Sequence, residues 1–202
     1  MKFLLSSILM LGLTMGACSC SADKSEDIYN PVPTPTPTPA GQKALVVYFS
    51  CTGTTKGVAE KIVETTGADI WEIAPAEPYT SADLNYNDES SRCCREHNNP
   101  AIRPALAENC AAVANHDVIF IGYPIWWGKA PNIIYTFLES HNLEDKTLVP
   151  FCTSASSPLG TSDTDLHNAA QKADWKAGRR FGYSTSAKTV SDWIAELGLN
   201  LQ

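Results

Sequence analysis

A hydroxyl-rich turn follows the first apolar segment of the domain. Residues 45–49 form an uninterrupted run of apolar and β-branched side chains, typical of a strand buried on both faces. The turn that ends this run consists of Ser50, Cys51, Thr52, Gly53, Thr54 and Thr55. A helical pattern follows over residues 57–66, so several backbone N–H groups meet at the positive end of a helix. This turn is therefore predicted to bind an anion.

Three common phosphate-binding patterns are missing from this turn. A Walker A loop ends in Gly-Lys-Ser/Thr, whereas here Lys56 is followed by Gly57. A phosphatase loop beginning at Cys51 would place a phosphate-clamping arginine at the position of Gly57. The Gly-x-Gly-x-x-Gly spacing of dinucleotide-binding loops is also missing. The hydroxyls and amides that are left suit a phosphate monoester; the alternative is an ordinary strand–turn–helix with threonine caps.

Two later turns also have an unusual composition. The apolar run at 117–123 leads into Pro124, Ile125, Trp126, Trp127 and Gly128. A single tryptophan in a loop usually folds back into the core, but two adjacent ones cannot both point inward comfortably, so one is expected to lie flat against a planar ligand. The run at 147–153 leads into a turn that offers hydroxyls and amides, made of Thr153, Ser154, Ala155, Ser156, Ser157 and Gly160.

These three turns resemble the ligand loops of the flavodoxin family. The family's phosphate loop reads Ser/Thr-x-Thr-Gly-x-Thr after the first strand, as residues 50–55 do, and residues 123–128 and 152–157 look like its two flavin loops. The resemblance covers residues 43–202 and implies FMN as the cofactor. It also implies that residues 50–55 hold the phosphate, that the Trp127 ring covers one flavin face and that the Trp127–Gly128 peptide meets flavin N5.

One departure from the family concerns the second flavin face. Many flavodoxins cover that face with an aromatic residue from the third loop, which here reads Ser-Ala-Ser-Ser-Pro. Tyr79 or Tyr86 is the candidate substitute, because both lie in a long polar excursion over residues 76–104 that is either a lid or inert padding. If neither substitutes, the open face suits electron exchange with a small molecule.

The rest of the domain alternates strand and helix patterns. Strands are expected at 69–75, 117–123, 147–153 and, weakly, 175–181, and helices at 104–115, 131–140, 164–172 and 187–197. This alternation predicts an α/β fold with helices on both faces of a mostly parallel sheet. The resemblance makes it a flavodoxin-like, doubly wound, five-stranded parallel sheet of order 2-1-3-4-5. Ligands of such sheets bind outside the carboxyl ends of the strands, where all three turns lie.

The N-terminal segment is typical of an exported lipoprotein. Residues 1–17 contain one positive charge and a short apolar run, as a signal peptide does, and residues 15–18 resemble a lipobox with methionine in place of leucine. Cys18 is the expected lipidation site; the alternatives are cleavage before Cys20 and plain secretion with a free Cys18. Residues 18–42 include a Pro/Thr repeat expected to act as a semi-rigid linker. The prediction is a protein lipid-anchored to a bacterial membrane, on its periplasmic or cell-surface face.

Charge and cysteine content restrict the partners further. The formal net charge is −7, and because acidic proteins are repelled by nucleic acids and anionic lipids, neither is an expected partner. Cys51 and Cys152 are interpreted as packing residues near the ligand. A disulfide from Cys110 to Cys93 or Cys94 is the prediction for an oxidising compartment. The spacing of Cys93 and Cys94 with the nearby histidine matches no standard zinc pattern, so no metal site is assigned.

Three functions remain open at this level. The first is an FMN-binding electron carrier tethered to a membrane, which exchanges electrons with a redox partner protein or a small acceptor. The second is an FMN-dependent reductase of quinones that uses a reduced nicotinamide. The third is a flavodoxin-like module that has lost the flavin and only binds a partner. No catalytic acid or base is assigned, because flavin redox chemistry is supplied by the cofactor.

Overall fold

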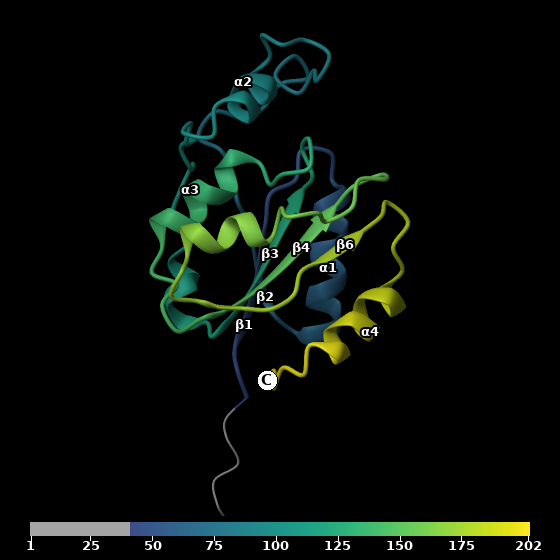
Figure 1. Ribbon diagram of the computed structural model, residues 1–202. Helices are drawn as coiled ribbons and strands as arrows, with labels where there is room; N and C mark the ends of the chain where they lie inside the picture. Colours follow the sequence, from purple (N-terminus) through teal and green to yellow (C-terminus); the bar gives the residue numbers. More distant parts are fainter. Residues whose placement is uncertain (1–40) are drawn as a thin grey trace, which may run out of the picture. The chain divides into compact units, whose positions relative to one another are not determined.

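The computed structural model describes residues 41–202, which form one sheet with helices on both faces (Figure 1). The strands are β1 (Ala44–Tyr48), β2 (Asp69–Glu72), β3 (Val118–Pro124), β4 (Thr147–Thr153), β5 (Asp174–Trp175) and β6 (Arg179–Phe181). The helices are α1 (Thr54–Thr66), α2 (Arg92–Asn98), α3 (Asn132–Ser140) and α4 (Ala187–Glu196), with 3-10 helices η1 (Ala111–Asn115) and η2 (Thr164–Ala169). The predicted signal peptide, Cys18 and nearly all of the predicted linker lie outside the described residues.

The predicted sheet topology is confirmed. The strands are parallel and follow the order β2-β1-β3-β4-β5, with Val46 paired to Phe120 and Phe120 to Val149 across the three central strands. The weak strand predicted at 175–181 is two short strands, β5 and β6, both of which pair with β4. The break lies opposite Pro150, which has no N–H to donate to a neighbouring strand.

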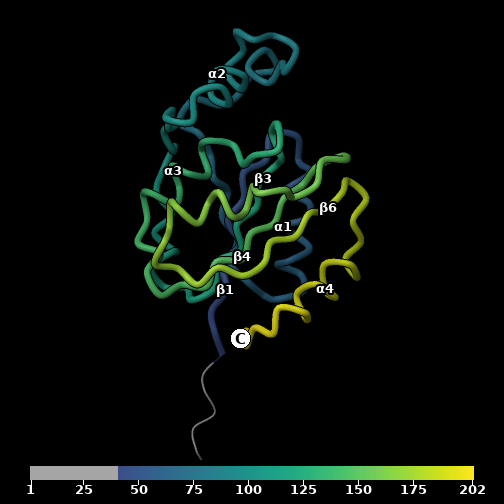
Figure 2. Tube along the Cα trace, viewed as in Figure 1, coloured from purple at the N-terminus to yellow at the C-terminus, as the bar shows by residue number. Residues whose placement is uncertain are grey.

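Two apolar layers enclose the sheet and explain the uninterrupted apolar runs of β1 and β3. Successive side chains of a strand point to opposite faces, so a strand covered on both sides is apolar throughout. On one face Leu45, Val47, Ile119 and Ile121 pack with Ile133, Ile134 and Phe137 of α3. On the other face Val46, Phe120 and Val149 pack with Val58 and Ile62 of α1 and with Val190 and Trp193 of α4. The trace in Figure 2 shows α1 and α4 on the side of the sheet away from α3.

The prediction of a helix at 104–115 is wrong over most of that range. Residues 105–107 pair instead with residues 74–76: the Ala76 N–H donates to the Ala105 carbonyl and the Ala107 N–H to the Ala74 carbonyl, both at 2.8 Å. Only η1 at the end of the predicted range is helical. The sequence analysis also missed α2, whose start is capped by Ser91, since its Oγ accepts from the Cys94 N–H at 3.4 Å. The pairing of 105–107 with 74–76 is long-range and is not contained in a local pattern, whereas the signals for α2, the Ser91 cap and the Arg92–Glu96 pair one helical turn apart, are local.

Other predicted elements differ in smaller ways. Helix α1 begins at Thr54, before the predicted start at 57, and β2 ends at Glu72, before the predicted end at 75. The helix predicted at 164–172 is the 3-10 helix η2, and β3, α3, β4 and α4 lie close to their predicted ranges. Cysteines 51, 93, 94, 110 and 152 are free thiols, so the structure does not contain the predicted disulfide.

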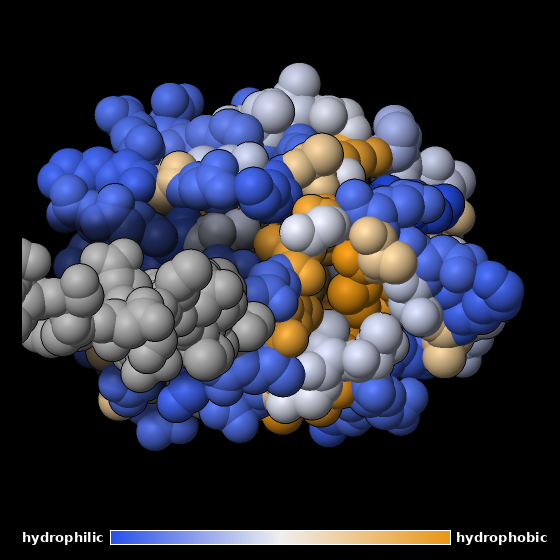
Figure 3. Space-filling model, turned by 90° about the horizontal axis from the view of Figure 1, so that it is seen from below, coloured by the Kyte–Doolittle hydropathy of each residue, from blue (hydrophilic) through white to orange (hydrophobic). Residues whose placement is uncertain are grey.

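The end of the domain away from the three turns is seen from below in Figure 3. Apolar side chains are visible near its centre and hydrophilic residues surround them. The first and last described residues meet: Gln42 pairs with Leu201, and the Gln42 N–H donates to the Asn200 carbonyl at 2.6 Å. Within residues 41–202 no helix combines the length and the apolar character that crossing a membrane requires.

Candidate functional site

A cavity of about 420 Å³ lies at the carboxyl ends of the central strands and is called the site cavity below. Its walls come from the β1–α1 turn, the turn after β3 and the long excursion between β2 and β3, which rises beyond these strand ends in Figure 1. The lining residues are Ser50, Cys51, Thr52, Thr55, Leu84, Tyr86, Cys93, Pro124, Ile125, Trp126 and Trp127. Two of the three predicted turns therefore share one cavity.

The β1–α1 turn presents hydroxyls and uncapped amides. Ser50, Thr52 and Thr55 line the site cavity, and Gly53 precedes α1 in the left-handed region with a φ of 83°. No side chain caps the start of α1, so the N–H groups of its first turn remain available to a ligand. Gly53 and Thr54 do not line the site cavity: the Gly53 N–H donates to Ser50 Oγ at 3.1 Å, and Thr54 Oγ1 lies 3.5 Å from Thr52 Oγ1.

The turn after β3 is a two-residue hairpin with a strained tryptophan. Trp126 and Lys129 exchange two backbone hydrogen bonds, of 2.9 and 3.0 Å, around Trp127 and Gly128. Both central residues have positive φ, 46° at Trp127 and 80° at Gly128. Glycine adopts this region freely, whereas a tryptophan there carries backbone strain of about 1–3 kcal/mol. Such strain at the wall of a cavity favours a functional role for the turn.

The two tryptophans of this turn take different positions. Trp126 is partly buried and packs edge-on against Phe49 at 5.8 Å and Tyr79 at 5.6 Å. Trp127 is 45 % exposed and lines the site cavity. The sequence-based expectation that only one of them points inward agrees with this arrangement. Gly128 completes the turn without lining the site cavity.

The turn after β4 contacts the site only through Thr153. Thr153 is buried, and its Oγ1 lies 2.8 Å from Oγ1 of Thr55. Arg180 holds the next residues, donating to Ser154 Oγ at 3.0 Å and to the carbonyls of Ser154 and Ala155 at 2.8 and 2.7 Å. The Ser154 hydroxyl donates to the Ser157 carbonyl. Ser154, Ala155, Ser156, Ser157 and Gly160 do not line the site cavity.

The excursion supplies wall residues that the sequence analysis largely missed. Tyr86 is 71 % exposed and lines the site cavity, as one of the two expected alternatives, whereas Tyr79 lies behind Trp126. Leu84 and Cys93 also line it and were not predicted. The sequence holds no signal for them, because the excursion has no regular period that would fix which side chains face the strands.

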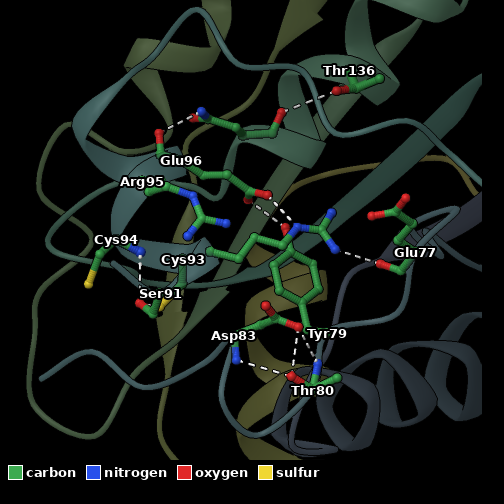
Figure 4. A network of polar contacts seen from close by, with 12 residues as sticks. Glu77, Tyr79, Thr80, Asp83, Ser91, Cys93, Cys94, Arg95, Glu96 and Thr136 are labelled. Atoms are coloured by element: carbon green, nitrogen blue, oxygen red, sulfur yellow. Dashed lines mark hydrogen bonds and ion pairs between the residues drawn. The ribbon is translucent and has the colours of Figure 1, made fainter. Parts of the chain in front are cut away.

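A buried polar network fixes the excursion to the rest of the domain (Figure 4). Glu96 is 4 % exposed, and its carboxylate accepts from Tyr79 Oη at 2.5 Å and from Arg92 Nε at 2.7 Å. The Arg92 guanidinium lies 4.0 Å from the centre of the Tyr79 ring. Asn132 of α3 donates to the Glu96 carbonyl at 2.8 Å. Burial, and then the bond to Glu96, raise the pKa of Tyr79, so its hydroxyl stays a donor at neutral pH.

The wall of the site cavity is electrically neutral. Its lining contains no lysine, arginine, aspartate or glutamate. Burial, followed by the neighbouring Cys93, raises the pKa of Cys51 to about 12, so this thiol is protonated at neutral pH. An anionic group bound here would therefore be held by hydroxyls and amides, and a planar ring would meet aromatic side chains.

The chain belongs to the flavodoxin family, whose sequence profile matches residues 43–197. A protein described as a flavoprotein from Bacteroides eggerthii is 46 % identical, with a TM-score of 0.75 over 79 % of this chain and 99 % of that one. Another flavoprotein, from Bacteroides uniformis, is 41 % identical, with a TM-score of 0.74 over 77 % of this chain and 99 % of that one. A Lactobacillus acidophilus flavoprotein solved in complex with FMN shares the fold at 22 % identity, with a TM-score of 0.61 over 78 % and 99 %. Comparison with curated proteins gives no match.

The contact between Thr55 and Thr153 yields a first testable prediction. Both hydroxyls are buried, so Thr55→Val leaves Thr153 Oγ1 without its partner and is expected to lower the free energy of unfolding by about 1–2 kcal/mol. The double variant, Thr55→Val with Thr153→Val, is expected to recover much of this loss because neither polar atom remains. Urea unfolding measures both values. A double variant as unstable as the sum of the two single variants would contradict the pairing.

Proposed function

We propose that this flavodoxin-family protein binds FMN in the site cavity and transfers electrons through it. One observation carries the proposal: the uncapped start of α1, three hydroxyl side chains and an exposed indole meet in one neutral cavity. Its size, about 420 Å³, lies in the range of small-molecule sites. The family match and the FMN complex of the Lactobacillus acidophilus flavoprotein support the choice of cofactor.

Each turn has a proposed role toward FMN. The first-turn N–H groups of α1, with the hydroxyls of Ser50, Thr52 and Thr55, hold the phosphate. Trp127 would stack on the flavin ring, and the Trp127–Gly128 peptide would hydrogen-bond to flavin N5. The turn at 153–160 would serve the polar edge of the ring. Bound FMN supplies the acceptance and release of one or two electrons.

The chain's own contribution is to bind, shield and tune the cofactor. The aromatic wall would shield part of the ring from water, and the acidic chain, with a formal net charge of −7, disfavours the addition of negative charge at the site. The same charge attracts basic redox partners and speeds their association. A membrane-tethered electron carrier is the proposed role, with the lipid on Cys18 and residues 18–42 as the tether.

One observation favours a second candidate, an FMN-dependent reductase of quinones that uses a reduced nicotinamide. Tyr86, the aromatic residue that the excursion contributes to the cavity wall, is largely exposed, so that wall leaves room for a small molecule. Mixing the FMN-loaded protein with reduced nicotinamide and a quinone separates the candidates. Steady turnover supports the reductase, whereas electron exchange with a protein partner alone supports the carrier.

FMN binding is tested by titrating the purified protein with FMN and following flavin fluorescence. Trp127→Ala removes the proposed stacking partner and is expected to weaken binding about tenfold, the size of one aromatic contact. Tyr183→Ala is the control, because Tyr183 is 89 % exposed and does not line the site cavity. A protein that takes up no FMN, or one whose affinity falls equally in both variants, contradicts the proposed site.

Export and lipidation are tested separately. Expression of the full chain and of Cys18→Ala in a Gram-negative host, followed by membrane fractionation, is expected to give membrane-bound protein only with the cysteine present. Equal distribution of the two proteins would leave the tether without support, while FMN binding would be unaffected.

A further inference from the structure

The imidazole of His97 stacks on the indole of Trp127. The ring centres lie 4.7 Å apart and the ring planes are inclined by 26°. His97 belongs to α2, whereas Trp127 belongs to the turn after β3. Trp127 lines the site cavity, whereas His97 lines a neighbouring cavity of about 310 Å³. The imidazole therefore contacts a wall residue of the site cavity without lining that cavity itself.

This stack supports a side chain that is 45 % exposed. Among the described residues His97 is the one aromatic partner of Trp127, whereas Trp126 packs against both Phe49 and Tyr79. Trp127 is also half exposed and has a strained backbone, with a φ of 46°. An exposed side chain on a strained turn populates several orientations unless a neighbour selects one of them.

We propose that His97 is a positioning residue for the proposed FMN site: it supports the outer face of Trp127 and so fixes the inner face toward the flavin ring. The inference rests on the proposed function, because it assigns His97 a role in the same site. Helix α2 is itself fixed through Glu96, whose carboxylate accepts from Tyr79 and whose carbonyl accepts from Asn132 of α3. The support is therefore continuous from the buried network to the indole.

Protonation of His97 is expected to loosen the stack. Burial, and then the positive charge of Lys129, lower the pKa of His97, so the imidazole is neutral at neutral pH. The other titratable residues of its cavity are Glu96, Arg103, Tyr135, Glu139 and Asp165. Glu96 is bound to Arg92, and Arg103 is paired with Glu139. An imidazolium would therefore meet the repulsion of Lys129 and the cost of burying a charge, which oppose the cation–π attraction that the indole offers it.

The sign of the pH effect follows from this lowered pKa. The unfolded chain takes up the His97 proton at a higher pH than the folded chain does. The stabilisation from the neutral stack is therefore complete above the ordinary histidine value of about 6.5 and is lost as the pH falls through the lowered value. FMN affinity is expected to decline over the same range.

Two substitutions in the full-length protein separate stacking from titration. His97→Phe keeps an aromatic ring and removes the titratable group, whereas His97→Gln removes the ring. At pH 7.5, His97→Gln is expected to bind FMN about two- to tenfold more weakly than the wild type, and His97→Phe within about twofold of it. Between pH 7.5 and 5.5 the wild type is expected to lose more FMN affinity than His97→Phe. Protonation of the FMN phosphate affects both proteins alike, so the difference between them reports on His97.

A measurement without FMN and a matched control complete the test. The indole N–H resonance of Trp127, assigned with Trp127→Phe, is expected to shift or broaden in apo His97→Gln and to stay sharp in His97→Phe. The control is His167→Gln, because His167 stacks on Trp175 at 4.5 Å and 27° and neither ring lines the site cavity. FMN affinity is expected to be unchanged in this control.

The outcomes distinguish the inference from the proposed function. If the wild type binds no FMN, the proposed function fails, and the apo resonance still reports whether His97 holds the indole. If FMN binds and His97→Gln matches the wild type in affinity at both pH values and in the Trp127 resonance, the positioning role is overturned.

Discussion

Gly122→Ala is expected to lower the free energy of unfolding by about 3 kcal/mol or more, at the upper end of the usual cost of overpacking a core. Gly122 pairs with Phe151 across β3 and β4, so their side chains would point to the same face of the sheet. A Cβ atom on Gly122 would lie 2.2, 2.5 and 2.9 Å from three atoms of the Phe151 ring. The ring is buried and packed with α4 in the second core layer, so it has little room to retreat.

A second substitution and a control make this prediction specific. Because the clash involves a single ring, the double variant Gly122→Ala, Phe151→Leu is expected to lose less free energy of unfolding than the two single variants lose together. The difference is expected to be at least about 1 kcal/mol. Gly57→Ala, in α1, is the matched control. A Cβ there meets only Lys61 Nζ at 4.0 Å, and the change is expected to stabilise the helix by up to about 1 kcal/mol. Urea unfolding that shows additive losses at positions 122 and 151 would contradict the ring's position.

Glu96→Ala is expected to lower the free energy of unfolding by about 3 kcal/mol, the lower end of the range for breaking a buried ion pair. The carboxylate side chain is 5 % exposed, and its removal leaves the Arg92 guanidinium and the Tyr79 hydroxyl without their acceptor. Arg92 is 17 % exposed, so water compensates part of the loss. Amide exchange should show the effect first in residues 76–104, because this network fixes the excursion.

The Arg103–Glu139 pair provides the control for this prediction. It has two hydrogen bonds, of 2.8 and 2.9 Å, but its side chains are 33 % and 43 % exposed. Glu139→Ala is therefore expected to cost less than about 1 kcal/mol. Glu96→Gln, which keeps one carbonyl acceptor, should lie between the two alanine variants. Equal losses in Glu96→Ala and Glu139→Ala would show that burial does not strengthen the Glu96 network.

The parts of the fold that the sequence predicted are those fixed by local composition. The apolar runs of β1, β3 and β4 identify buried parallel strands, and the turns that follow β1 and β3 do line one cavity. The excursion was not predictable in the same way. Its structure depends on partners distant in sequence, such as Leu106 with Pro75 and Glu96 with Tyr79, which no local pattern contains.

The same distinction between local composition and distant partners applies to the residues of the candidate site. The hydroxyls of the first turn and Trp127 follow from residue type and spacing, whereas Leu84, Cys93 and the His97 stack follow from where the excursion lies. The turn at 153–160 had the right composition, but Arg180 binds its carbonyls and holds it outside the cavity wall. A sequence read locally does not show which polar groups another side chain has already engaged.

The interruption opposite Pro150 also affects the outer border of the sheet. A long, regular outermost strand presents a row of free N–H and C=O groups on which a foreign strand can grow. Here that border consists of two fragments, Asp174–Trp175 and Arg179–Phe181, separated by a stretch that does not continue the ladder. Neither fragment is long enough to template a neighbouring chain, so this border resists the edge-to-edge association that leads to aggregates.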